Sequence, residues 1–338
     1  MYTDHYGLAE RPFQLTPDAR YWFESRTHKK AMAYLGYGLA QGEGFIVITG
    51  EIGAGKSTLV AHLMATIDRE RLNAISLVST QVEGDDMLRL AASGLGLETE
   101  GAAKAQLLDR VEHRLREEAG RGKRTLLIVD EAQNLPVSAL EELRMLSNFT
   151  SQGRSLIQIF LLGQPEFRDR VADDESLEQL RQRVIAAHHL EAMDANEIEP
   201  YAVHRLAVAG WQGRPGFEPE AFAALYRHSG GVPRKLNQLA TRLLLYAGVE
   251  ALETIGGGDV EAVAADMAAD RPASASKRVL PLRKELAEAQ PTSDADLERR
   301  IAAMEVRLEE QEAAVRRVLT VLLDWVENES RPRRSNAA

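Results

Sequence analysis

Short apolar runs rich in β-branched residues recur along the first half of the chain, and stretches with helical spacing of apolar positions lie between them. The pattern predicts strands at 45–49, 74–78, 125–129, 156–162 and 185–190, the last being the least apolar. It predicts helices between them, for instance at 103–118 and 137–149. Because strands that alternate with helices form parallel sheets covered on both faces, we expect an α/β domain over residues 45–193.

A different pattern begins near residue 194, where strand-like runs stop and helical spacing continues. Helices predicted at 197–209, 219–229 and 234–247 favour a small all-helical domain over residues 194–268. Residues 1–44 precede the first strand and are interpreted as an N-terminal linker segment that carries a helical pattern. Residues 269–295 hold three prolines among alanine, serine and charged residues, which is typical of a flexible linker.

Heptad spacing of apolar residues appears in residues 296–328, over about four heptads. The two core positions are occupied by Ile301, Leu308, Val315 and Leu322, and by Leu297, Met304, Gln311, Val318 and Trp325. This favours a coiled coil or a partner-binding helix over a lone amphipathic helix that packs on its own core, and Gln311 could set register or partner number. The tail, residues 329–338, is expected to be disordered.

The overall composition is that of a soluble protein with a sizeable core, since 44% of its 338 residues are hydrophobic and 27% are charged. A net charge of −10 argues against a dedicated nucleic-acid binder. The chain has no cysteine, which excludes disulfides and thiolate metal sites. No signal peptide and no apolar run of about 18 residues is visible, so we expect a cytoplasmic protein without a transmembrane segment, peripheral if it meets the inner membrane.

A glycine-rich loop joins the predicted strand 45–49 to a helical pattern, and it has the G-x-x-x-x-G-K-[ST] spacing of a phosphate-binding loop. Glycines allow successive N–H groups to turn toward a phosphate, and the helix amino terminus adds partial positive charge. Lys56 can reach the β- and γ-phosphates of ATP, and the Ser57 hydroxyl can ligate Mg²⁺. The residues assigned to nucleotide binding are Gly50, Glu51, Ile52, Gly53, Ala54, Gly55, Lys56, Ser57 and Thr58.

Two carboxylates end the most apolar predicted strand, 125–129. Asp130 is expected to hold Mg²⁺, directly or through water, and Glu131 to polarise the water that attacks the γ-phosphate. Together with the glycine-rich loop, this pair indicates ATP hydrolysis rather than phosphate binding alone. The three aromatic residues 21–23 could cover the adenine of the nucleotide, or they could be ordinary core.

Several motifs within residues 1–250 resemble those of AAA+ ATPases from secretion systems, the general-secretion-pathway protein A (ExeA-like) family. Within that family the similarity is greatest to the secretion ATPase encoded with exosortase (PEP-CTERM/XrtA) and exopolysaccharide loci. The motifs are FQLTPD at 13–18, QGEGF at 41–45, DEAQNL at 130–135, LLGQPEF at 161–167, LRQRV at 180–184 and GGVPR at 230–234. The resemblance implies a P-loop AAA+ parallel sheet flanked by helices and followed by a small helical lid domain, to which the sequence adds the C-terminal coiled-coil helix.

The same resemblance implies roles for further residues. Gln164 would be the polar sensor of the γ-phosphate, and Arg234 the sensor-2 arginine that contacts nucleotide and couples the two domains. Arg183 would be the arginine finger that reaches ATP bound in a neighbouring subunit. Arg181 could serve instead, and the less favoured alternative for Arg183 is a helix-surface arginine paired with Glu178 or a neighbour.

These features favour an oligomeric, Mg²⁺-dependent ATPase that drives or regulates envelope secretion, or the export and assembly of exopolysaccharide. The expected assembly is a homo-oligomer, of which a hexameric ring is one arrangement. Its expected partners are membrane-associated export proteins bound through the coiled coil, which could replace the membrane anchor of the family. Two alternatives stay open: a nucleotide-dependent recruitment switch with slow hydrolysis, and a DNA-associated helper ATPase, which the acidic composition disfavours.

Overall fold

The computed structural model describes residues 2–78 and 82–270. The predicted coiled coil (296–328), the predicted tail (329–338) and nearly all of the predicted linker lie outside the described residues. The described residues all belong to one compact unit. Within the described part of the chain, none of the helices has both the length and the apolar character needed to cross a membrane.

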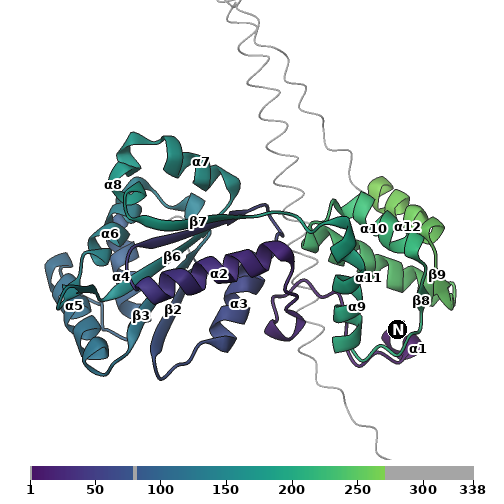
Figure 1. The fold of residues 1–338 in the computed structure, drawn as a ribbon, viewed down its shortest axis with the longest axis horizontal. Coiled ribbons are helices and arrows are strands. Elements are labelled where there is room, and N and C mark those ends of the chain that lie inside the picture. Colours follow the sequence, from purple (N-terminus) through teal and green to yellow (C-terminus); the bar gives the residue numbers. More distant parts are fainter. Residues whose placement is uncertain (1, 79–81, 271–338) are drawn as a thin grey trace, which may run out of the picture. The chain divides into compact units, whose positions relative to one another are not determined.

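A five-stranded sheet with the order β2–β3–β6–β1–β7 is the centre of the α/β domain (Figure 1). All neighbouring strands pair in parallel, which confirms the predicted fold class. Strands β1 and β6 are buried along their whole length. Because both of their faces are covered, their sequences are nearly continuous apolar runs. The strands are β1 (Phe45–Gly50), β2 (Leu72–Val78), β3 (Arg124–Asp130), β6 (Ile157–Gly163) and β7 (Val184–Leu190).

Alternate side chains of the strands pack into two separate cores, one on each face of the sheet. On one face, Ile46 and Ile48 pack with α2 (Arg26–Gln41) and α3 (Lys56–Thr66). The helices of the opposite face are α4 (Gly84–Gly94), α5 (Lys104–Gly120), α6 (Val137–Ser147), α7 (Pro165–Asp173) and α8 (Glu178–Arg181). Burial of each large apolar side chain contributes about 1.5–3 kcal/mol, so both helix layers hold the sheet firmly.

The α/β domain also contains a short hairpin and two 3-10 turns. A hairpin of β4 (Thr150–Ser151) and β5 (Arg154–Ser155) precedes β6. The 3-10 turn η2 (Ala132–Asn134) follows β3, and η3 (Glu175–Leu177) leads into α8. Of these, η2 shapes the candidate site described below.

The residues after β7 form a helical lid with its own core. Its helices are α9 (Ile198–Val208), α10 (Pro219–Ser229), α11 (Pro233–Val249) and α12 (Gly257–Ala269), preceded by the 3-10 turn η4 (Ala195–Glu197). The lid also holds a two-residue parallel pair, β8 (Gly216–Phe217) with β9 (Thr254–Ile255). Neither α12 nor this strand pair had been predicted.

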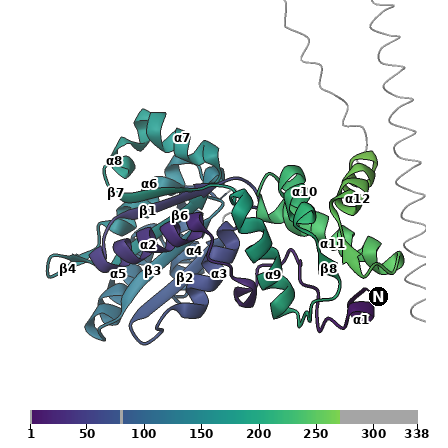
Figure 2. The same ribbon diagram turned by 45° about the vertical axis from the view of Figure 1, so that its right-hand side comes forward.

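The N-terminal residues belong to the lid before they reach the sheet. Helix α1 (Tyr2–Tyr6) packs on α11, and Tyr6, Leu8 and Phe13 are buried in the lid core. The segment that follows, residues 12–18, which we name the strap, leads through η1 (Ala19–Tyr21) to α2. Figure 2 shows that the chain therefore passes between the lid and the α/β domain twice, once at the strap and once after β7.

Candidate nucleotide site

The glycine-rich loop lies between β1 and α3, at the carboxyl ends of the sheet strands. Gly53 and Gly55 have φ angles of +86° and +101°, which residues with a Cβ rarely adopt. Gly55 is the N-cap of α3, so the first free N–H groups of the helix face the loop. A Cβ on Gly55 would also lie 2.5 Å from Nε2 of His28. The loop therefore has the backbone form of an anion-binding nest.

Lys56 lies in the first turn of α3 and is largely buried. Its Nζ donates to the carbonyls of Gly50, at 2.6 Å, and Glu51, at 3.1 Å. Burial lowers the pKa of Lys56, and the carboxylates of Glu131 and Asp130 oppose that shift. The ammonium is thus held over the loop, next to two acidic groups.

Ser57 and Asp130 supply oxygens fit for a metal ion. Ser57 Oγ donates to Asp130 Oδ2 over 3.3 Å, which brings the start of α3 against the end of β3. Burial raises the pKa of Asp130, and Lys56 and Ser57 oppose the shift. Burial of the charged Asp130 carboxylate is costly, and a bound cation would offset that cost. The carboxylate and the neighbouring Ser57 hydroxyl suit Mg²⁺, which prefers oxygen ligands and commonly retains waters.

Glu131 follows Asp130 with a strained backbone, φ 56° and ψ 39°. For a residue other than glycine, this left-handed conformation costs about 1–3 kcal/mol and is frequent at functional sites. Gln133, in η2, donates from Nε2 to Glu131 Oε2. Gln164, at the end of β6, lies 3.4 Å from the same oxygen through its own Nε2. The structure thus brings the predicted base and the predicted sensor together, and adds Gln133, to which sequence reasoning assigned no role.

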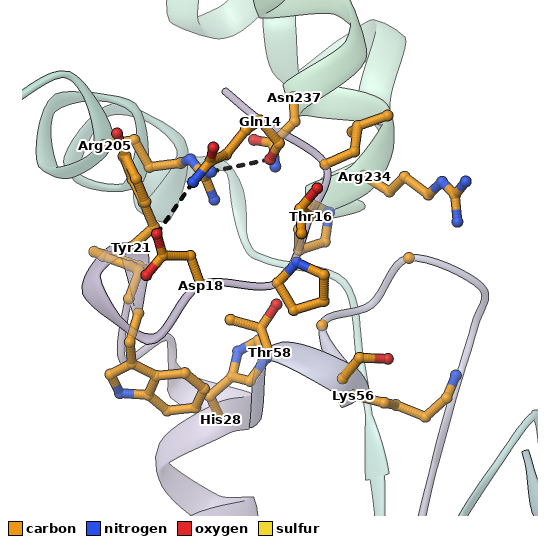
Figure 3. A pocket seen from close by; sticks show the side chains of 18 of the residues that line it. Gln14, Thr16, Asp18, Tyr21, His28, Lys56, Thr58, Arg205, Arg234 and Asn237 are labelled. Carbon is orange, nitrogen blue, oxygen red and sulfur yellow. Dashed lines mark hydrogen bonds between the residues drawn. The ribbon is translucent and has the colours of Figure 1, made fainter. Parts of the chain in front are cut away.

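The lid meets the glycine-rich loop through Arg234. The backbone N–H of Arg234 donates to the carbonyl of Gly53 over 3.2 Å. A Cβ on Gly53 would come within 2.3 Å of the Arg234 Cβ, so glycine is required here for the approach of α11 as well as for its φ. In Figure 3 the Arg234 side chain extends on the side of the pocket where Lys56 lies. The contact between Arg234 and nucleotide stays a prediction.

A cavity of about 310 Å³ joins these groups, a size within the range of small-molecule sites. Its walls come from the glycine-rich loop, the strap, η1, α2, α9 and α11. Its lining residues include Gln14, Thr16, Asp18, Tyr21, Trp22, Phe23, His28, Gly53, Gly55, Lys56, Ser57, Thr58, Glu131, Gln164, Tyr201, Arg205, Arg234 and Asn237.

The aromatic residues 21–23 all line this cavity. Trp22 stacks on His62, with ring centroids 4.3 Å apart, and its ring meets that of His28 edge to face. Tyr21 is only 2% exposed and so is also core. Burial lowers the pKa of His28 to about 4, and Ser25 Oγ lies 2.6 Å from its Nδ1. A neutral imidazole therefore supports the wall behind the loop.

Arg205, on α9, fastens the strap over the cavity and had not been singled out from the sequence. Its Nε donates to the carbonyl of Pro12 over 2.7 Å and its Nη2 to that of Gln14 over 3.1 Å. The guanidinium also lies 4.7 Å from the centre of the Tyr21 ring, a cation–π contact. Figure 3 shows Arg205 on the strap side of the pocket, where Gln14 also contacts Asp18.

The two arginine-finger candidates lie away from this cavity. Arg183 immediately precedes β7, whose first residue Val184 pairs with Phe45 at the opposite end of β1 from the glycine-rich loop. Its Nη1 donates to Ser147 Oγ over 3.0 Å. Arg181 pairs with Glu178 and donates to a backbone carbonyl of α7. Neither arginine lines the cavity of its own chain.

Comparison with known proteins agrees with this geometry. Residues 39–171 match the family model described as AAA domain. The chain is 36% identical over 272 residues to General secretion pathway protein A of Aeromonas hydrophila, which covers 80% of this chain and 49% of that protein. The chain thus spans about half the length of the relative that it matches.

Two solved structures resemble the fold. One is Cdc6p of Pyrobaculum aerophilum, with a TM-score of 0.58 and 15% identity over 75% of this chain and 70% of that chain. The other is the ORC2 protein of Aeropyrum pernix in ADPNP–ADP complexes, with a TM-score of 0.56 and 15% identity over 76% and 71% of the two chains. At such identities the similarity concerns the fold alone, a P-loop AAA+ sheet with a helical lid.

Proposed function

We propose, from the premise that this chain is a P-loop AAA+ protein related to General secretion pathway protein A, that it binds Mg²⁺–ATP and hydrolyses it to ADP and phosphate. The observation that carries the proposal is the convergence of the glycine-rich loop, Ser57, Asp130 and Glu131. Phosphate, metal and attacking water each have a matching group there.

Each group has a task that suits its position. When bound, Mg²⁺ would neutralise phosphate charge, and Ser57 and Asp130 are the residues that would hold it. Lys56 and the N–H groups of the loop would bind the phosphate oxygens. Glu131 would take the proton of the attacking water, and Gln164 would donate a hydrogen bond to the γ-phosphate without adding charge.

We propose that the second half of each site comes from a neighbouring copy, so that the protein acts as a homo-oligomer. The support is the location of Arg183, at the end of the sheet opposite its own glycine-rich loop. A guanidinium suits the spread charge of a phosphoryl transition state, and an arginine supplied by a neighbour accelerates hydrolysis strongly in other P-loop enzymes.

We further propose that the work of hydrolysis is delivered to a secretion or exopolysaccharide-export machine at the inner membrane. The relationship to General secretion pathway protein A supports the first part of this proposal. A pull-down with the Glu131→Gln variant and ATP, with and without residues 271–338, tests it. We expect export proteins to bind the full chain and to be absent from the shorter one, because the predicted coiled coil lies within residues 271–338. Identical partners for both chains would contradict partner binding through this C-terminal segment.

The hydrolysis itself is tested by phosphate release from ATP with and without Mg²⁺. We expect Lys56→Ala to abolish nucleotide binding, and Glu131→Gln to retain binding while the rate falls by about 10²–10⁴, the usual contribution of a positioned base. Wild-type protein that binds ATP without Glu131-dependent turnover would reject the hydrolase proposal.

A further inference from the structure

We propose that Gln133 is a positioning residue that orients the Glu131 carboxylate and couples it to Gln164. The inference rests on the proposed function, since it concerns the same hydrolytic step. One amide side chain contacts both groups: Nε2 of Gln133 donates to Glu131 Oε2, and Oε1 of Gln133 accepts from the backbone N–H of Gln164 over 3.0 Å.

The orientation of this amide follows from the chemistry of its two neighbours. A backbone N–H can only donate, so it requires the amide oxygen of Gln133. An ionised carboxylate can only accept, so it requires the amide nitrogen. Rotation of the amide by 180° would place donor against donor and acceptor against acceptor. Gln133 therefore works as a bridge of fixed polarity between the end of β3 and the end of β6.

The backbone around Gln133 is fixed at both ends. The N–H of Asn134 donates to the carbonyl of Glu131 over 3.0 Å, which closes the turn that the left-handed Glu131 begins. At the other end, Arg170 of α7 donates from Nη1 to the carbonyl of Leu135 over 2.6 Å. Strain at Glu131 and these two closures direct Gln133 back toward the carboxylate, as positioning requires.

The bridge separates two tasks that would otherwise compete. Gln164 Nε2 also lies near Glu131 Oε2, at the longer distance of 3.4 Å, and a turn of the Gln164 side chain toward a phosphate would lengthen this contact. Gln133 can keep its contact with the carboxylate while Gln164 changes partner, because Gln133 is tied to the backbone of Gln164 and not to its side chain. The Glu131 carboxylate thus stays oriented while the Gln164 side chain moves. A displacement of the Gln164 backbone, at the end of β6, would be transmitted to Glu131 through the Gln133 side chain.

The test compares Gln133→Met, which removes both contacts, with Gln133→Glu, which retains the acceptor for Gln164 but sets a second carboxylate against Glu131. We expect kcat to fall about 10- to 100-fold in Gln133→Met, a part of what a positioned base contributes, and further in Gln133→Glu. The Kd for ATP, measured by direct binding, should stay within about twofold of wild type. The matched control is Gln106→Met, an exposed glutamine at the start of α5, which should leave both constants unchanged.

A second measurement separates positioning from packing. In a Glu131→Gln background, single-turnover hydrolysis should not fall further when Gln133→Met is added, because Gln133 acts through the missing carboxylate. Additive losses, or ATP affinity lost in step with kcat, would assign Gln133 to packing and overturn the inference. Wild-type hydrolysis that Glu131→Gln abolishes but Gln133→Met leaves intact would overturn this inference alone, whereas absence of Glu131-dependent hydrolysis would overturn the proposed function with it.

Discussion

At the scale of single residues, burial of ionisable groups is the recurring feature of the site. Burial lowers the pKa of Lys56 and of His28 and raises the pKa of Asp130, so in all three it favours the neutral form of the side chain. Lys56 and Asp130 also face each other's charge, which limits their shifts. At His28 the Gly55 backbone and the Glu197 charge oppose the effect of burial, yet the pKa still falls to about 4, so this burial should appear in the stability of the protein.

His28 predicts a pH dependence of stability. The folded state lowers its pKa from 6.5 to about 4, so between those values the unfolded chain binds more protons. Stability should be fully present above pH 6.5 and decline as pH falls toward 4, and between about pH 7.5 and about pH 5 His28 should account for about 2 kcal/mol. Urea unfolding of wild type and His28→Gln at both pH values measures this difference. Equal pH slopes for the two proteins would show that His28 is not neutral in the folded state.

Single residues also show where prediction from sequence stops. Lys56, Ser57, Asp130 and Glu131 could be assigned because a short motif states both the residue types and their spacing. Arg205 could not, because a buried arginine on an apolar helix face has no local signature and its partners are strap carbonyls 191 and 193 positions away. Long-range contacts of this kind depend on the folded arrangement, which no window of sequence contains.

At the scale of elements, the strands could be predicted because continuous apolar runs are diagnostic when a sheet is covered on both faces. Helix α12 was missed because its alanine-rich sequence starts with two glycines and has little apolar periodicity. The pair β8–β9 is too short for any period to appear. The boundaries predicted for α10 match those of the structure, since a proline opens that helix and a left-handed glycine ends it.

The turn between α10 and α11 offers a matched pair of substitutions. Gly230 and Gly231 both have positive φ, but only at Gly231 would a Cβ collide, 2.1 Å from the carbonyl oxygen of Met193. We expect Gly230→Ala to cost about 1–2 kcal/mol from backbone strain alone, and Gly231→Ala about 1–3 kcal/mol more. Chemical denaturation of both variants compares them. Equal losses of unfolding free energy in the two variants would mean that the backbone at Met193 shifts to accommodate the added Cβ at no energetic cost.

The fastening of the strap by α9 predicts a joint effect on stability and binding. Arg205→Met should destabilise the protein by about 2–4 kcal/mol, because it leaves two strap carbonyls without their charged donor. It should also weaken ATP binding, since the strap lines the cavity. The control is Arg242→Met, which removes only an exposed ion pair with Asp270 and should change stability by less than about 0.5 kcal/mol. Wild-type ATP affinity in Arg205→Met would contradict a contribution of the strap to nucleotide binding.

At the scale of the whole molecule, the distance between Arg183 and its own glycine-rich loop predicts complementation between defective copies. Glu131→Gln leaves the arginine intact, and Arg183→Ala leaves the site intact. Equal mixing should restore about a quarter of the wild-type rate, because one interface in four then joins an intact site to an intact arginine.

Phosphate release from the mixture, compared with each variant alone, is the measurement. The same experiment with Arg181→Ala decides which of the two arginines is supplied to the neighbour. A mixture no faster than the mean of its two components, for both arginines, would rule out a shared site.

The two passages of the chain between lid and sheet have a mechanical consequence. A body attached at two points can turn easily only about the line that joins them, so the strap and the segment after β7 together define an axis for the lid. The hydrogen bond from Arg234 to Gly53 couples lid rotation to the glycine-rich loop. A displacement of the loop at the phosphates would thus be transmitted to the lid as rotation about this axis.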